Sequence, residues 1–252
     1  RVFAWVGLPE REEGQKVPGM VLVHGGGGTA YAEWVRIWNA RGYAAIAMDL
    51  EGGLPAVGEA PREATHAWSG PARAGRFADL LEPVTEQWYY HAVADVILAH
   101  SLLRSYPAVD AERIGLTGIS WGGILSGTVS GVDSRFKFVI PVYGCGFLNE
   151  APLFKTSMTS LNVDLSARWM AQWDPSGYLP RAAMPMLWVN GPNDQHFPLD
   201  VHARSVALPR GTQWLSVRVG LLHSHHHGWA PEEIYAFADY MNGRGEPMVR
   251  VL

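Results

Sequence analysis

Ser120 stands in a glycine spacing that is typical of serine nucleophiles, Gly118-Ile-Ser-Trp-Gly122. The G-x-S-x-G pattern alone is weak evidence, because a glycine-rich chain can contain it by chance. Its surroundings strengthen it, since a strand-like run over residues 113–117 precedes it and a helix-like run over 121–130 follows. A serine at such a turn is lifted to the edge of a sheet. The alternative is an ordinary turn in which Ser120 caps the helix.

A serine hydroxyl needs a base, and the base needs an acid that orients it. Where the serine follows a strand in this way, the acid comes later in the chain and the histidine last. We favour Asp194 as the acid, because it lies in the exit loop of a strand predicted over residues 186–190. Asp174, before a proline, and Asp200, at a helix start, are its competitors. An aspartate that only stabilises a turn is the structural alternative.

Four histidines fall within five positions before the last predicted helix: His223, His225, His226 and His227. We favour His225 as the base, because it has left the preceding strand and is close enough to Pro231 for the loop to fold back. His223 is the main alternative, and His226 and His227 take third place. A metal-binding cluster is a further alternative. It is disfavoured because the cluster contains no Asp, Glu or Cys and the chain has no H-E-x-x-H motif, so we predict no metal site.

The oxyanion formed during acyl transfer needs backbone N–H donors. One is expected from Trp121, the residue after the serine, and another from the glycine turn His24-Gly-Gly-Gly-Gly28. We predict Gly26 and Gly27 as the donors of that turn. A phosphate-binding loop is the alternative, but neither G-x-G-x-x-G nor a following G-K-[ST] is present. We therefore predict no cofactor.

These residues would be positioned by strands that alternate with helices. Apolar strand-like runs cover residues 2–6, 20–24, 43–48, 113–117, 136–142, 184–190 and 214–219. Helix-like runs cover residues 29–41, 88–104, 121–130, 199–208 and 231–241. Such alternation predicts an α/β fold, with a mostly parallel twisted sheet and helices on both faces. The loops at the carboxyl ends of the strands would then carry the site.

The chain has 252 residues, which we interpret as a single catalytic domain over 1–252. Two long insertions, about 50–87 and 144–183, would form a cap over the carboxyl edge. The hydrophobic share of 48% excludes a disordered chain, and the single Cys145 excludes an internal disulfide or a Cys-based zinc site.

The charge and hydropathy of the chain limit its partners. The formal charge of −4 (20 Lys and Arg against 24 Asp and Glu) gives no case for nucleic acid or an anionic membrane. No apolar stretch is long enough for a membrane span, so we predict a soluble chain. The oligomeric state and the compartment stay open. The strand-like start at Arg1 suggests that a leader or a first strand precedes it, and a leader would mean export.

Four motifs resemble those of the α/β-hydrolase superfamily: His24-Gly-Gly-Gly-Gly-Thr29, Gly118-Ile-Ser-Trp-Gly-Gly123, Gly191-Pro-Asn-Asp194 and the His-x-His-x-x-Gly-Trp-x-Pro-Glu stretch that starts at His223. Within it the chain looks like the dienelactone-hydrolase and prolyl-oligopeptidase side, and specifically like acetyl-xylan-esterase-like carbohydrate esterases. Two departures stand out. The usual first strand or two of the family are expected upstream of Arg1, and Ser120 stands where dienelactone hydrolases have cysteine.

The resemblance implies a serine ester hydrolase that removes small acyl groups, such as acetate, from a carbohydrate. The alternatives are a serine peptidase of the prolyl-oligopeptidase type and a catalytically silent binding module. Aromatic residues in the two insertions could stack on a sugar ring or an acyl group. They could equally form a small satellite core. From this set we predict that the substrate pocket is lined by Trp68, Trp88, Trp169 and Trp173.

Overall fold

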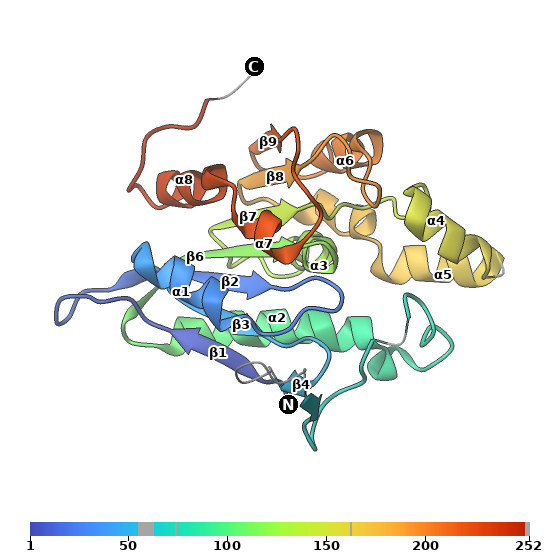
Figure 1. Ribbon diagram of the computed structural model, residues 1–252, viewed down its shortest axis with the longest axis horizontal. Helices are drawn as coiled ribbons and strands as arrows, with labels where there is room; N and C mark the ends of the chain where they lie inside the picture. The colour runs from blue at the N-terminus through green and yellow to red at the C-terminus, as the bar shows by residue number, and fades with distance from the viewer. Residues whose placement is uncertain (55–62, 74, 162, 250–252) are drawn as a thin grey trace.

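The computed structural model describes residues 1–54, 63–73, 75–161 and 163–249, and its centre is a seven-stranded sheet (Figure 1). The strand order is β1-β3-β2-β6-β7-β8-β9. All neighbouring strands pair in parallel except β1, which is antiparallel to β3. The strands are β1 (Ala4–Gly7), β2 (Val17–Val23), β3 (Ala44–Met48), β6 (Val109–Ile119), β7 (Phe138–Val142), β8 (Met186–Asn190) and β9 (Gln213–Val217).

Continuous apolar runs form the inner strands because both faces of the sheet are covered. Every residue of β2, β3, β7 and β8 is buried. The edge strand β9 differs, since Leu215 and Val217 are exposed. The predicted mostly parallel α/β sheet is thus confirmed, and β6 extends beyond the run predicted for it at both ends.

Helices cover both faces of the sheet (Figure 1). On one face α1 (Ala32–Ala40) packs against α8 (Glu232–Met241), with the rings of Trp38 and Tyr235 4.8 Å apart. On the other face α2 (Trp88–Ser105) is joined to α3 (Trp121–Ser130) by a 2.8 Å hydrogen bond between Tyr89 Oη and Thr128 Oγ1. The helix α6 (Leu199–Val206) follows β8.

The two predicted insertions leave the carboxyl edge of the sheet. The second contains α4 (Pro152–Thr159), α5 (Val163–Trp173) and the 3₁₀ turns η2 (Pro175–Gly177) and η3 (Leu179–Arg181). Figure 1 shows α4 and α5 beyond the carboxyl ends of the strands. The first contains the strand pair β4 (Gly53–Leu54) and β5 (Glu63–Thr65) and the turn η1 (Val84–Glu86). Part of it, residues 55–62, lies outside the described residues.

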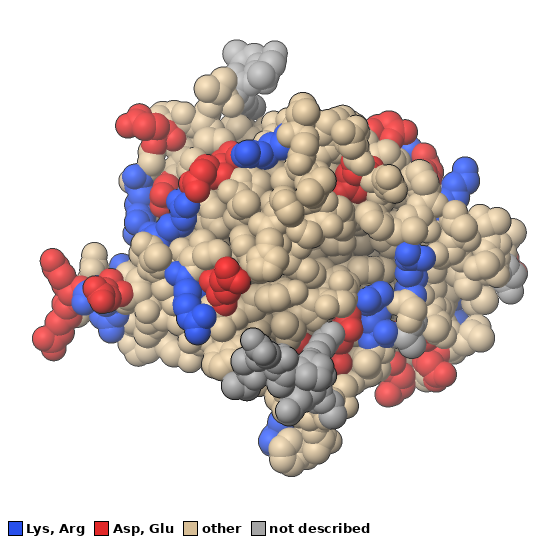
Figure 2. All heavy atoms as spheres, in the orientation of Figure 1, with Lys and Arg blue, Asp and Glu red and all other residues tan. Residues whose placement is uncertain are grey.

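The surface shows no single dominant charge on the face drawn in Figure 2. Among the described residues, acidic and basic side chains are interspersed around the rim of that face, and its centre carries few of either. No helix in the described part of the chain combines the length and apolar character needed to cross a membrane.

Candidate active site

Ser120 lies at a sharp turn between β6 and α3, where its backbone has a positive φ of 58° and a ψ of −116°. Such a conformation costs about 1–3 kcal/mol in a non-glycine residue and must be held by its surroundings. Its N–H donates to the Val142 carbonyl at 2.9 Å. The flanking glycines permit the crossing: a Cβ on Gly118 would lie 2.1 Å from the Gly122 carbonyl oxygen, and one on Gly122 2.0 Å from that of Val23. The two glycines of the motif are therefore required because the backbone passes too close for a side chain at either position.

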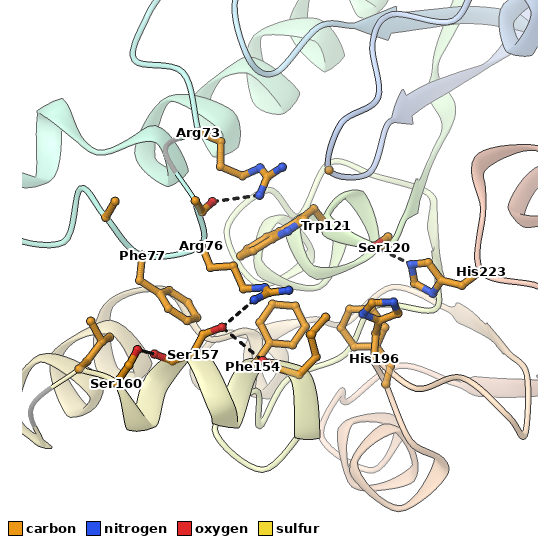
Figure 3. A pocket seen from close by; sticks show the side chains of 16 residues that line it. Arg73, Arg76, Phe77, Ser120, Trp121, Phe154, Ser157, Ser160, His196 and His223 are labelled. Carbon is orange, nitrogen blue, oxygen red and sulfur yellow. Dashed lines mark hydrogen bonds between the residues drawn. The ribbon is translucent and has the colours of Figure 1, made fainter.

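The structure places His223 between Ser120 and Asp194. His223 Nε2 is 3.0 Å from Ser120 Oγ, and His223 Nδ1 is 2.7 Å from Asp194 Oδ2 (Figure 3 shows the first contact). A neutral His223 that donates from Nδ1 to the carboxylate leaves Nε2 as the acceptor for the serine hydroxyl. Serine, histidine and aspartate are thus joined by hydrogen bonds, as in a serine hydrolase triad.

The Asp194 carboxylate is buried and held by its own loop. Its Oδ1 accepts hydrogen bonds from the N–H groups of His196 and Phe197, at 2.8 and 2.9 Å. Burial opposes ionisation of the group. The hydrogen bond from His223 and the two backbone donors outweigh that effect and lower the pKa of Asp194 below its ordinary value. The aspartate is therefore ionised where it meets the histidine.

The prediction that His225 is the base is wrong, because the structure places His223 next to Ser120 Oγ and His225 elsewhere. His225 Nε2 accepts the backbone N–H of Gly25 at 2.9 Å, 200 residues away in the chain. Burial, with a smaller contribution from neighbouring histidines, lowers its pKa to about 4, so the ring is neutral and can accept. His225 stabilises the glycine turn and does not contact Ser120 Oγ.

Helix geometry explains why the base lies two residues earlier. The short helix α7 (His225–Trp229) was not predicted, and Ser224 caps it by accepting the N–H of His227. His223 is therefore the last histidine in the extended loop, and the hydroxyl of Tyr143 donates to the neighbouring Leu222 carbonyl at 2.7 Å. His226 and His227, the third choice as base, are exposed on α7.

Asp174 and Asp200, the other candidates for the acid, lie in a turn and at a helix start. Asp174 accepts backbone hydrogen bonds from Phe147, Leu148 and Ser176, and so organises the turn after α5. Asp200 lies in the first turn of α6. Neither hydrogen-bonds to His223, so Asp194 is the acid that the structure brings to the histidine.

Two of the predicted oxyanion donors border the space in front of Ser120. Trp121 is the first residue of α3, so its N–H has no acceptor within the helix. Gly26 lines the same cavity, and a Cβ there would lie 2.8 Å from the Trp121 ring. Gly27 is not among the lining residues. It has φ +70° and allows the turn to close, with the Gly28 N–H donating to the Gly25 carbonyl at 3.0 Å.

The cavity in front of Ser120 measures about 650 Å³. On one side lie Ser120, Trp121, His196, Phe197 and His223. We call residues 73 and 75–78 together with α4 the opposite wall (Figure 3). That wall presents Arg73, Arg76, Phe77, Phe154 and Ser157 to the cavity. The arginines and serines were not singled out in the sequence, where they stand in no motif.

None of the four predicted pocket tryptophans lines this cavity. Trp68 is 66% exposed and contacts the N-terminal Arg1. The other three are buried in the hydrophobic core, where their indole rings pack around Tyr89: Trp88, Trp169 and Trp173. Two of them use the indole N–H to reach a buried acceptor, Trp88 at Leu50 and Trp173 at Gln87.

Among the described side chains, no group of three or more His, Cys, Asp or Glu is placed to hold a metal ion. The histidine cluster is dispersed because its members lie on different sides of the loop and of α7. One contacts Ser120, one the glycine turn, and two face solvent.

The model of the family "Acetyl xylan esterase (AXE1)" matches residues 1–153, more than half of the chain. The chain belongs to the acetyl xylan esterase family. The matched part includes Ser120 and the glycine turn, whereas Asp194 and His223 lie beyond it. Family membership supports a hydrolase of carboxylic esters.

Two solved acetyl xylan esterases have the same fold. The enzyme from Paenibacillus sp. R4 has a TM-score of 0.76 at 20% identity, covering 96% of this chain and 79% of its own. Acetyl xylan esterase 1 from Thermoanaerobacterium sp. JW/SL YS485 has a TM-score of 0.75 at 17% identity, covering 95% and 79%. At these identities the likeness shows the α/β-hydrolase fold.

One curated relative is named as a peptidase and not as an esterase: the uncharacterized peptidase YuxL of Bacillus subtilis (strain 168). It is 23% identical over 212 residues, which are 79% of this chain and 29% of the relative. The chain spans less than a third of the length of the curated relatives it matches. This member of the acetyl xylan esterase family thus resembles solved esterases in fold and proteins named as peptidases in sequence.

Proposed function

We propose that the protein is a serine ester hydrolase that works through an acyl-enzyme. The observation that carries this proposal is the hydrogen-bonded chain from Ser120 through His223 to Asp194. As Ser120 Oγ attacks the ester carbonyl, its proton passes to His223 Nε2. The resulting imidazolium is stabilised by the ionised Asp194 and gives the proton to the leaving alcohol oxygen.

The second half of the cycle reverses these roles. A water molecule loses a proton to His223 Nε2 while its oxygen attacks the acyl carbonyl on Ser120. Collapse of the tetrahedral intermediate returns the proton to Ser120 Oγ and releases the carboxylic acid. In both halves the negative oxygen is stabilised by the N–H of Trp121, the amino end of α3 and the Gly26 turn.

We further propose that the acyl group is small, such as acetate, and that the alcohol is a carbohydrate. Membership of the acetyl xylan esterase family supports this substrate class. The cavity supports it through a mixture of ring surfaces and polar groups, since Trp121 and Phe154 line it together with Ser157 and Ser160. Rings that face a sugar together with a few polar groups are typical of small-molecule sites.

A serine peptidase is the second candidate, because two curated relatives are named as peptidases. The same triad would cleave an amide by the same steps. A silent binding module is less well supported, since the serine, histidine and aspartate are assembled in a hydrogen-bonded chain.

A substrate panel distinguishes these candidates. Para-nitrophenyl acetate, butyrate and longer esters would be assayed beside an acetylated xylo-oligosaccharide and a peptidyl-proline anilide, each with Ser120→Ala as the control. We expect hydrolysis of the acetate ester and of the oligosaccharide, lost in the variant. Faster cleavage of the anilide would favour the peptidase, and no turnover of any substrate would favour the binding module.

A further inference from the structure

The cavity in front of Ser120 has an unbalanced charge. Arg73 and Arg76 line it, and none of its 16 lining residues is an aspartate or a glutamate. This differs from the chain as a whole, which carries a formal charge of −4. A local excess of positive charge in a partly enclosed site attracts anions.

Arg73 is held rigidly and is largely neutralised. Its Nε lies 3.1 Å from Glu51 Oε1, and its Nη1 donates to the Gly75 carbonyl at 3.0 Å. Its guanidinium also lies over the rings of Trp88 and Trp121, at 5.8 and 5.6 Å from their centroids. Arg73 therefore supports the wall beside Trp121 more than it offers free charge.

Arg76 is the less compensated of the two. Its Nη1 donates to Ser157 Oγ at 2.7 Å, and the guanidinium lies 5.8 Å from the centre of the Phe154 ring. Among the side chains that the structure describes, no carboxylate lies within ion-pair distance of it. Figure 3 shows the side chain reaching across the cavity between Trp121 and Phe154, toward the end that holds Ser120 and His223.

The charge of Arg76 acts on His196, which lies at the catalytic end of the cavity. His196 lies there, with its ring 4.4 Å from that of His223. Burial lowers the pKa of His196, and the neighbouring His223 ring and the charge of Arg76 lower it further, against the opposing effect of Asp194. A guanidinium whose partners are a hydroxyl and a ring face keeps N–H donors available for a negatively charged ligand.

We propose that the ester substrate carries a carboxylate, and that Arg76 binds it while Ser120 attacks the ester; this rests on the proposed hydrolase function. The planar guanidinium suits a carboxylate, because two parallel N–H donors match its two oxygens. The carboxylate would belong either to an acidic sugar on the alcohol side or to a dicarboxylic acyl group. Both place a negative charge near the opposite wall.

Two matched pairs of esters test this inference and separate the two sources. The first pair is the acetylated methyl glycosides of glucuronic acid and of glucose. The second is para-nitrophenyl hemisuccinate and para-nitrophenyl butyrate. We expect kcat/KM for the charged member of one pair to exceed that of the neutral member by at least about tenfold, as one charge-assisted hydrogen bond can provide. The preference should shrink as the ionic strength rises.

Variants assign the preference to Arg76. Arg76→Gln should reduce the ratio of charged to neutral kcat/KM to near one, and Arg76→Lys should retain part of it. Arg36→Gln removes an exposed arginine on α1 and should leave the ratio unchanged. A ratio near one for both pairs in the parent enzyme, or a ratio that Arg76→Gln does not change, would overturn the inference while leaving the hydrolase function intact.

Binding provides a readout that does not depend on turnover. Ser120→Ala would be titrated calorimetrically with both acetylated glycosides. It would also be titrated with succinamic acid, which carries a carboxylate, and with butyramide, which is neutral. We expect tighter binding of the charged ligand of one pair, lost when Arg76→Gln is added. If the parent enzyme cleaves no ester but this preference is present, the hydrolase function fails and the carboxylate site stands. Equal binding of charged and neutral ligands would reject the site.

Discussion

The two sides of the cavity are built in different ways. Ser120, Asp194 and His223 follow β6, β8 and β9, and backbone hydrogen bonds from neighbouring strands and loops fix them. The opposite wall comes from the insertions, and its two parts meet through side chains such as the bond between Arg76 and Ser157. The reaction therefore depends on the sheet, and selectivity depends on the insertions. A change on the sheet side should affect all substrates, and a change on the wall should discriminate between them.

The largest effect is expected at Ser120. Ser120→Ala removes the attacking oxygen, and we expect kcat for every ester to fall by about 10⁴ to 10⁶. The melting temperature should stay within a few degrees of the parent, because the small hydroxyl carries little of the fold. Activity above about one hundredth of the parent rate would contradict the role of Ser120.

The second-largest effect on kcat distinguishes His223 from His225. His223→Ala should cost at least about 10³ in kcat, since triad members act as a unit. His225→Ala should cost no more than about 10² in kcat. Its main effect should be a loss of roughly 1–3 kcal/mol in the free energy of unfolding, because the buried Gly25 N–H loses its acceptor. Kinetics and urea unfolding of both variants measure this contrast, and the reverse order of the kcat losses would restore His225 as the base.

These histidines also mark how far the sequence can predict the site. The glycine spacing around Ser120 and the position of Asp194 after a strand indicated both residues, because backbone geometry demands them. The choice between His223 and His225 depended on where α7 begins, and the Ser224 cap that decides it was not apparent among four neighbouring histidines. The mostly parallel sheet was predictable because its buried strands are continuous apolar runs.

The opposite wall was much less predictable. Tryptophans in an insertion fit a substrate pocket and a satellite core equally well, and Trp169 and Trp173 were assigned to the pocket although they pack in the core. Arg76 stands in no motif or periodic pattern. Its place in the cavity comes from a contact between two insertions, with Ser157 81 residues away in the chain.

A smaller effect concerns acid stability on the sheet side, beneath the Asp194 loop. His202 on α6 is fully buried against Trp188 of β8, and burial lowers its pKa to about 4 from 6.5. Below pH 6.5 the unfolded chain binds a proton that the folded chain does not. The free energy of unfolding should therefore fall as the pH decreases from about 6.5 to about 4.

His202→Leu should flatten that pH dependence, and it should not destabilise the protein at pH 7, because neither ring nitrogen has a partner among the described residues. Urea unfolding at several pH values would measure both effects. An equally steep acid loss in the variant would show that His202 does not contribute to it.

The smallest effect is expected at Trp68, which the sequence placed in the pocket and the structure places outside it. Trp68→Ala should change kcat/KM by less than about twofold, because the exposed indole borders neither the triad nor the opposite wall. Phe154→Ala, which alters a ring that does line the cavity, is the matched comparison and should raise KM. A loss of activity in the Trp68 variant as large as in the Phe154 variant would bring Trp68 back to the substrate.

The most direct test of the central claim is to trap the acyl-enzyme. The enzyme would be mixed rapidly with para-nitrophenyl acetate, quenched in acid and digested, and the acetylated peptide would be identified by mass spectrometry. The triad geometry predicts one acetyl group, on Ser120, that is absent from Ser120→Ala and forms much more slowly in His223→Ala. Acetylation of a different residue during turnover, or turnover that persists in Ser120→Ala, would contradict the claim.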